Sequence, residues 1–479
     1  MPTTNGNRKL LDLKAWNFCT PSPSATVAGS LIISSRHYRQ QQLLVTSTTQ
    51  AILYNPSEDG WVQVPSPALA GTFGAGAAGT AGSFSTGTTV GASSLTATAG
   101  TTTSITTNQT LARDLRGYSV YFVGGTNAGK LKTIASNTIG ANAVITFDSA
   151  EAAAFDATSQ YRIKAPVFYL LGAGTLASGS FKKYDFATNT WTTLSNTGLP
   201  ASLATDGRMV GTPAWIDSGF KSFATGTATA GGATTLTNSG KNWATNQWAN
   251  SCQVRITGGT GTGQIRIISS NTATALTVST AWTTNPDATS TYSIEGNDDY
   301  LYYMGNNAVT LYRYSIAGNT WTTLSPGVAR AGAPGAGMGG SWVHSVPAAD
   351  WNVENTILNG RYIYAFRGGA TAALDRYDIA ANSWTALTYA PATETFTGGT
   401  KYVYNKDRIY LTKEATGRWF YFDIAEQAMH GWTTVLYTQG AAIVGDTAFD
   451  VTYKDGATEI EYIYFVFNTS TVLYRQMVI

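Results

Sequence analysis

The chain has 479 residues, of which 12% are charged, and its formal net charge is +2. This balance, without a run of Lys or Arg, argues against general nucleic-acid binding, and the polar N-terminus does not resemble a signal peptide. Three histidines and two cysteines argue against a His-rich metal centre and a disulfide framework. No apolar stretch is long enough for a membrane span. We therefore expect no catalytic residues, no cofactor and no metal.

The first predicted element is a short strand at residues 11–18, which contains Trp16. At the other end of the chain, residues 462–467 and 471–479 form two predicted strands that no tryptophan strand follows. An unpaired outer strand would leave an open sheet edge. We therefore expect the strand of Trp16 to pair with residues 471–479 and to close the last blade of a ring.

A short sequence motif recurs along the chain and consists of a tyrosine, a polar turn and a strand that contains a tryptophan. Its six tryptophans are Trp16, Trp61, Trp191, Trp321, Trp384 and Trp432. Two of the clearest copies begin with the pairs Tyr184-Asp185 and Tyr377-Asp378. A strand, a turn and a strand repeated in this way predict the blades of a β-propeller. Six tryptophan strands predict six blades, and we expect the indoles to be buried between them.

Two inserts lengthen the distance between successive tryptophans. Residues 82–163 and 221–295 share a Gly-Gly-Thr turn and an Asp-Ala-Thr-Ser segment, which indicates a duplication. The sequence of each insert predicts several short strands, so we expect two small β-modules. The propeller then occupies residues 1–80, 164–220 and 296–479.

Both inserts enter between the first and second strands of their blades, so the modules should stand side by side on one face. Their polar, weakly charged surfaces suit contact with other proteins. The candidate interface residues are Asn127, Lys130, Trp243, Trp248, Thr260, Thr262 and Trp282.

The repeat resembles the kelch repeat, which combines a hydrophobic strand, sometimes a double glycine, a Tyr-Asp pair and a tryptophan strand. One copy keeps the double glycine, at Gly368-Gly369. The resemblance covers the chain outside the inserts. It implies an all-β fold: a six-bladed kelch-like β-propeller with an N-terminal closing strand and two inserted β-domains. Propellers serve enzymes, adhesins and assembly platforms, so the resemblance says little about function.

The inserts resemble small β-modules that recur in the tail and virion proteins of tailed bacteriophages. This resemblance implies a noncatalytic structural or attachment protein of the virion, associated with the tail, neck or a fibre. The expected partners are other virion proteins, in multiple copies, and a host-surface glycan, with no nucleic acid and no membrane span. We expect synthesis in the host cytoplasm and a final location in the virion.

The alternative is a propeller that binds or cleaves glycans, as a lectin or as a sialidase-like or oxidase-like enzyme. Paired carboxylates for glycoside hydrolysis converge in space and not in sequence, and Asp299, Asp350 and Glu354 could be proposed for such a pair. A third alternative is an intracellular kelch adaptor. Glycan-binding and hydrolysis assays and the neighbouring genes distinguish these functions.

Overall fold

The chain folds as strands and connecting loops in a computed structural model. The structure describes residues 17–27, 30–34, 41–56, 58–73, 77–86, 95–111, 114–116, 118–127, 130–186, 188–203, 207–211, 222–250, 252–296, 300–305, 309–316, 318–330, 341–343, 362–367, 371–389, 394–395, 402–405, 408–413, 418–424, 426–433, 447–455, 458–466 and 471–478. Within these ranges all regular elements are β-strands, so this part of the chain is all-β. The same ranges hold no helix with the length and apolar character that a membrane crossing needs.

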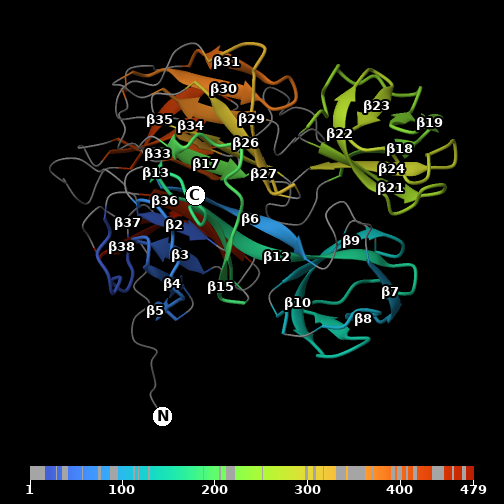
Figure 1. Ribbon diagram of the computed structural model, residues 1–479, viewed down its shortest axis with the longest axis horizontal. Coiled ribbons are helices and arrows are strands. Elements are labelled where there is room, and N and C mark those ends of the chain that lie inside the picture. Colours follow the sequence, from blue (N-terminus) through green and yellow to red (C-terminus); the bar gives the residue numbers. More distant parts are fainter. Residues whose placement is uncertain are drawn as a thin grey trace.

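Five four-stranded antiparallel sheets form most of a propeller-like ring (Figure 1). The first contains β1 (Asn17–Phe18), β38 (Leu473–Val478), β37 (Thr458–Val466) and β36 (Thr447–Asp455). The second contains β2 (Leu31–Ser34), β3 (Gln42–Val45), β4 (Ala51–Asn55) and β5 (Gly60–Gln63). The third contains β17 (Arg208–Gly211), β25 (Tyr300–Met304), β26 (Leu311–Ser315) and β27 (Thr320–Thr323). The fourth contains β28 (Ser341–Val343), β29 (Tyr362–Phe366), β30 (Leu374–Asp378) and β31 (Ser383–Leu387). The fifth contains β32 (Tyr402–Asn405), β33 (Arg408–Lys413), β34 (Arg418–Asp423) and β35 (Ala428–Thr433).

A nine-stranded sheet joins the ring to the first insert. Its ring strands are β6 (Ala78–Thr86), β12 (Gln160–Leu171), β14 (Phe181–Asp185) and β15 (Thr190–Thr193). Its other strands are β7 (Leu95–Gly100), β8 (Ser104–Thr107), β9 (Ser119–Gly124), β10 (Leu131–Asn137) and β11 (Val144–Phe147). The ring therefore has five separate four-stranded sheets and not the six predicted. The reason is β12, which continues without a break from the insert into the ring and merges the two sheets.

The first insert forms a closed six-stranded barrel. Its strands pair in the order β12, β7, β8, β11, β10 and β9, and β9 returns to β12. Its interior is filled by aliphatic and aromatic side chains, among which Phe122 and Phe155 stack with centroids 4.4 Å apart. We call β7 to β11 and the beginning of β12 module 1. β6 and β12 run through the predicted limits of this module at residues 82 and 163.

The second insert forms a seven-stranded sheet, here called module 2. Its strands, in sheet order, are β18 (Ser222–Thr227), β24 (Thr291–Gly296), β21 (Cys252–Gly258), β22 (Ile265–Asn271), β23 (Ala275–Val278), β20 (Thr235–Thr237) and β19 (Ala230–Gly232). A two-stranded sheet, β13 (Gly174–Thr175) with β16 (Ser202–Leu203), lies outside both modules. The modules lie next to each other beside the ring (Figure 1).

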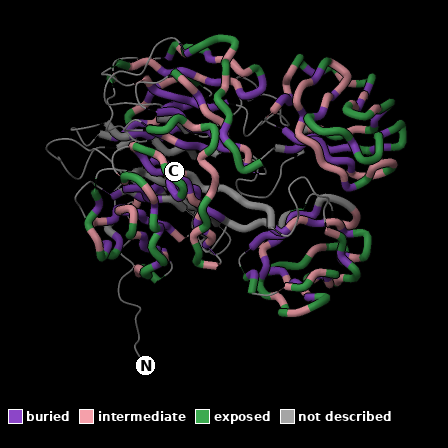
Figure 2. The backbone as a smooth tube through the Cα atoms, in the orientation of Figure 1, coloured by how far each residue is buried: buried purple, intermediate pink, exposed green. Residues whose placement is uncertain are grey.

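The order of the sheets around the ring follows from their innermost strands. β36, β2, β6, β17, β28 and β32 adjoin one another in this order, and β32 adjoins β36 again. Apolar side chains fill the spaces between neighbouring sheets, as where Phe181 of β14 contacts Trp321 of β27 with ring centroids 5.2 Å apart. Figure 2 shows the buried residues concentrated along the ring strands and inside both modules.

The local sequence explains which strands are central and which are at the edge. β3 and β29 are apolar, aromatic or small along most of their length and are buried at every position, because neighbouring sheets cover both of their faces. β15 and β27 share the sequence Thr-Trp-Thr-Thr, in which the threonines are exposed. At the joint of the chain ends, Asn17 and Phe18 of β1 pair with Arg475 and Tyr474 of β38. Trp16, the tryptophan predicted for this strand, lies outside the described residues.

Candidate functional site

The two modules meet at a buried polar contact between β9 and β24, beside β21. The hydroxyl of Tyr121 in module 1 donates a hydrogen bond of 2.5 Å to Oε2 of Glu295 in module 2. Each of these residues is only 1% exposed. The contact therefore joins the modules in a region from which most solvent is excluded.

Glu295 is also held by side chains of its own module. Nε and Nη2 of Arg255 lie 2.7 and 2.5 Å from Oε1, and Nε2 of Gln253 lies 3.3 Å from Oε2. Burial raises the pKa of Tyr121 and the charge of Glu295 raises it further, so the phenol remains a donor. Burial lowers the pKa of Arg255, but Glu295 and Tyr121 together raise it above its usual value, so the guanidinium remains charged. A buried carboxylate is tolerated when it is paired and hydrogen-bonded in this way.

The contact uses corresponding strands of the duplicated inserts. Tyr121 and Arg255 each stand three residues before the Gly-Gly-Thr turn of their own module, and both bind Glu295. At the edge of the contact, a Cβ atom on Gly263 of module 2 would lie 1.6 Å from Oε1 of Gln160 in module 1. The φ of Gly263 is +87°, a region that other residues rarely adopt. The positive φ therefore favours glycine at this position, beside the end of the Gln160 side chain.

The Asp-Ala-Thr-Ser segment fastens a turn in module 1. Oδ1 of Asp156 accepts hydrogen bonds from N and Oγ1 of Thr158 at 2.8 and 2.6 Å, and Oδ2 accepts one from Oγ1 of Thr126 at 2.7 Å. Oγ of Ser159 donates to the carbonyl oxygen of Thr126 at 3.2 Å. These bonds tie the segment to the Gly-Gly-Thr turn, and they lower the pKa of Asp156, with Thr158 as the main cause.

Module 2 repeats this arrangement. Asp287 accepts hydrogen bonds from N and Oγ1 of Thr289 at 2.8 and 2.6 Å, and Ser290 donates to the carbonyl oxygen of Thr260 at 2.6 Å. The sequence identified these segments as marks of a duplication but did not reveal this role. The signal was present, because an Asp followed two residues later by Thr is typical of a side-chain-capped turn.

Four of the predicted interface residues lie at or near the surface of the modules. Asn127 adopts a φ of +64° and its Nδ2 donates to the carbonyl oxygen of Ala153 at 2.8 Å. Lys130 is exposed and its Nζ lies 3.3 Å from Glu151. Thr260 is half-buried in the fastened turn, and Thr262 is exposed beside it. These residues remain candidates for contact with a partner.

The other three predicted interface residues are corrected by the structure. Trp243, Trp248 and Trp282 are 9%, 2% and 5% exposed and form part of the core of module 2. A short sheet of this size needs large apolar side chains to cover its inner face, and the indoles supply that area. The aromatic residues therefore stabilise the module and are not available to a partner.

The repeated tyrosine and tryptophan are direct cross-strand partners in the ring. Tyr184 pairs with Trp191 and Tyr377 with Trp384, with ring centroids 5.0 and 5.2 Å apart. Asp185 and Asp378 accept bonds from backbone amides of the following turn, at 3.1 Å from Thr188 and 2.9 Å from Ala380. Asp185 also accepts a bond from the hydroxyl of Tyr118, which ties module 1 to the ring.

The burial of the tryptophans is less uniform than predicted. Trp321 and Trp384 are each 3% exposed, whereas Trp61 and Trp191 are half-buried. Trp432 lies in β35. The two half-buried indoles reach the edge of the ring, where Nε1 of Trp191 donates to the carbonyl oxygen of Pro65 at 2.9 Å.

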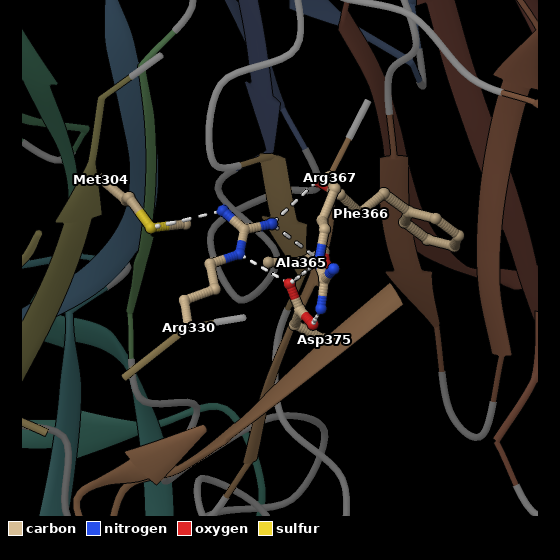
Figure 3. A network of polar contacts seen from close by, with 6 residues as sticks. All are labelled: Met304, Arg330, Ala365, Phe366, Arg367 and Asp375. Carbon is tan, nitrogen blue, oxygen red and sulfur yellow. Dashed lines mark hydrogen bonds and ion pairs between the residues drawn. The ribbon is translucent and has the colours of Figure 1, made fainter. Parts of the chain in front are cut away.

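A second buried charge cluster lies within the ring, between β25 and β29 (Figure 3). Asp375 accepts Nε of Arg330 and Nε of Arg367, both at 2.7 Å. Arg330 also donates to the carbonyl oxygen of Phe366 at 3.1 Å and to the sulfur of Met304 at 3.7 Å. The side chains of Arg330 and Asp375 are 0% and 1% exposed. The cluster holds two neighbouring sheets together.

The described residues contain no group of three or more His, Cys, Asp or Glu side chains placed to hold a metal ion. His430 stacks on Tyr421 with ring centroids 4.8 Å apart and contacts Glu426 at 2.9 Å. Asp299, Asp350 and Glu354, the acids proposed for a hydrolytic pair, lie outside the described residues, as does the double glycine Gly368-Gly369.

Comparisons with known proteins give no family. No protein-family model matches the chain. No curated protein matches it either. Among solved structures, the chain is similar to one from the "Crystal Structure of Mitotic Checkpoint Complex", with 8% identity, a TM-score of 0.34 and coverage of 100% of this chain and 99% of that one. It is also similar to the structure of YjhT, with 8% identity, a TM-score of 0.34 and coverage of 95% and 99%. A structural genomics protein of unknown function from Bacteroides thetaiotaomicron has 9% identity, a TM-score of 0.23 and coverage of 78% and 93%. These TM-scores are too low to indicate a shared function, and the strand pairing of the chain itself defines its fold.

Proposed function

We propose that this chain is a noncatalytic structural or attachment protein of a tailed bacteriophage virion. In this proposal the propeller-like ring is a scaffold, and the two modules present the surface that contacts other virion proteins or the host. The observation that carries the proposal is the buried bond between Tyr121 and Glu295. Because this bond fixes the two modules to each other, they should behave as one rigid unit. A rigid unit suits a surface through which a virion protein transmits force. The likeness of the inserts to phage tail modules supplies the biological setting.

We also propose that the ring has six kelch-like blades. The sixth would be formed by β6, β12, β14 and β15, which pair in the same order as the strands of the five separate sheets. The closed circuit of innermost strands supports this count, because β6 takes its place between β2 and β17. The pairing of Tyr184 with Trp191 supports it further, because it repeats the pairing seen in the other sheets.

The composition of the module surface is consistent with assembly. Module 2 has few charged side chains apart from the buried pair, so association need not remove many ions from water. In a particle, several copies would act together and weak contacts would give firm attachment. The proposed partners are therefore other virion proteins and, at the outer surface, a host glycan.

The test removes both modules and leaves the ring. Residues 87–161 and 222–296 would each be replaced by a short Gly-Ser linker, and circular dichroism and melting would report whether the ring still folds. We expect a folded ring that is no longer incorporated into particles or no longer supports attachment. If incorporation and infectivity both survived, the modules would not be the functional surface. Saturable glycan binding or glycan hydrolysis by the isolated ring would instead favour a glycan-active protein.

A further inference from the structure

The two modules are attached to the ring in different ways. Module 1 shares its hydrophobic core with the ring, because one cluster of buried residues contains both Phe122 of module 1 and Trp321 of the ring. β12 also runs from the ring into module 1 without a break (Figure 1). Module 1 therefore cannot separate from the ring without exposing apolar surface and breaking strand pairs.

Module 2 has a hydrophobic core of its own. All members of this cluster lie between Ala224 and Ile294, within the module itself. Residues 212–221 and 297–299 connect the module to β17 and β25, and they lie outside the described residues. Within the described part of the chain, module 2 is therefore a separately packed body.

The junction between the modules is polar. Tyr121 of module 1 meets Glu295 there, and Glu295 is held by Arg255 and Gln253. All four residues are buried.

This polar character makes separation of the modules less costly than separation of module 1 from the ring. The bonds from Arg255 and Gln253 to Glu295 lie within module 2, so they would remain if the modules separated. The bond from Tyr121 would be exchanged for bonds to water. Separation would thus hydrate polar groups and leave both hydrophobic cores intact.

We propose that the bond between Tyr121 and Glu295 is a latch, and that module 2 docks on module 1 and is released from it as a rigid body. Parts of a chain move relative to each other unless a large hydrophobic interface joins them. In the docked state the modules form the rigid unit described above. In the released state module 1 keeps its place on the ring, and the junction faces of both modules become accessible. The proposal concerns the chain alone and does not depend on its place in a virion.

The test measures the distance between the modules in the full chain by pulsed electron paramagnetic resonance. Spin labels are attached through the substitutions T102C in module 1 and T280C in module 2. Thr102 and Thr280 are exposed, whereas the native Cys19 and Cys252 are buried. We expect one narrow distance distribution, that of the docked state, in the labelled parent chain.

The variant Y121F removes the hydroxyl of the latch and almost nothing else. Loss of a hydrogen bond to a carboxylate should raise the ratio of released to docked molecules about tenfold or more. The distance distribution should therefore gain a second, broader population. Y121E is the stronger variant, because a second carboxylate against Glu295 adds repulsion and should make the released state predominate. Circular dichroism checks that both variants remain folded.

Y118F is the matched control. Tyr118 also donates its hydroxyl to a carboxylate, that of Asp185, but this bond joins module 1 to the ring. Y118F thus removes a phenol of the same kind from the same module without touching the junction, and the distance distribution should not change. The same narrow distribution in Y121F and Y121E would overturn the proposal, and so would an equal broadening in Y118F.

Discussion

The backbone amide of Ser195 donates a hydrogen bond of 2.9 Å to Oδ1 of Asn319, although 124 residues separate them. Ser195 stands four residues after Trp191, and Asn319 belongs to the turn before the next repeated tryptophan, Trp321. The same oxygen accepts the hydroxyl of Tyr314 at 2.7 Å. The side chain of Asn319 thus stabilises the turn to which it belongs and also binds the preceding sheet. The repeated motif therefore contributes to the contact between neighbouring sheets.

The first prediction compares Asn319 with Asn189. Asn189 accepts the hydroxyl of Tyr184 at 2.7 Å, but the residue of the preceding sheet that corresponds to Ser195 is Pro65, which has no N–H. Asn189 and Asn319 both have a positive φ, 54° and 48° respectively. The backbone strain that an alanine adds at such a φ is therefore the same in both variants. N319A should therefore lower the free energy of unfolding by about 1 kcal/mol more than N189A, the value of one hydrogen bond. Equal losses in urea denaturation would contradict the proposed tie.

The second prediction concerns the tryptophans. Trp321 is buried between two sheets, whereas Trp191 is half-buried. W321A should reduce stability by about 3–5 kcal/mol, and W191A by roughly half as much, in proportion to the apolar area lost. Chemical denaturation of the two variants measures the difference. A larger loss for W191A would show that burial does not set the cost.

The sequence predicted the repeat, but not which tryptophans are buried. In four copies of the repeat the tyrosine and the tryptophan have the same spacing, so the pattern identifies Tyr184 and Trp191 as equivalents of Tyr377 and Trp384. Burial of Trp191 depends on which residues of the preceding sheet reach it, and those are distant in sequence. Likewise, Trp243 and Trp282 were placed at an interface because nothing local distinguishes a core indole in a small module from an exposed one.

The third prediction separates the two roles of Glu295. E295A leaves Arg255 buried without its carboxylate and should destabilise module 2 by about 3–5 kcal/mol. Y121F removes only the hydrogen bond between the modules and should lower the free energy of unfolding by at most about 3 kcal/mol. Hydrogen exchange followed by mass spectrometry should show faster exchange across module 2 in E295A. In Y121F the increase should be confined to the junction, and a uniform increase would refute this division.

The fourth prediction concerns pH. Burial lowers the pKa of Lys183 from 10.5 to about 8, although Asp185 opposes the shift. Below pH 8 the folded chain keeps a charged, poorly hydrated ammonium, and between pH 8 and 10.5 only the unfolded chain remains protonated. The stability of the wild type relative to K183M should therefore rise across this window. K241M serves as the control, and a parallel pH profile for the wild type and K183M would contradict the shift.

The fifth prediction tests the joint between the chain ends. The amide groups of Cys19 and Ser22 donate to the carbonyl oxygens of Leu473 and Thr471 at 2.9 and 2.6 Å, and Thr20 exchanges bonds with Asp59 and Trp61 at 2.9 Å each. Deleting residues 1–23 removes these four bonds, each of which contributes about 0.5–1.5 kcal/mol. The melting temperature should therefore fall. A truncated chain that melts at the same temperature as the full chain would argue against closure by the N-terminal strand.

The difference between the predicted and the observed number of sheets also has a physical reason. The spacing of tryptophans counts repeats, but it does not say where one hydrogen-bonded sheet ends. β12 carries Gln160 and Tyr161 into the barrel and Val167 to Leu171 into the ring as one strand, so the two sheets merge. Pro166 lies in that passage and by itself would suggest a break, yet β12 runs through it.

The most direct measurement of the central claim is quantitative mass spectrometry of phage particles purified from a lysate that contains this chain. If the protein is a virion component, it should copurify with the particles in a fixed number of copies relative to the major capsid protein. It should also stay bound through density-gradient centrifugation. A chain that is abundant in the lysate but absent from the purified particles would contradict the proposed function.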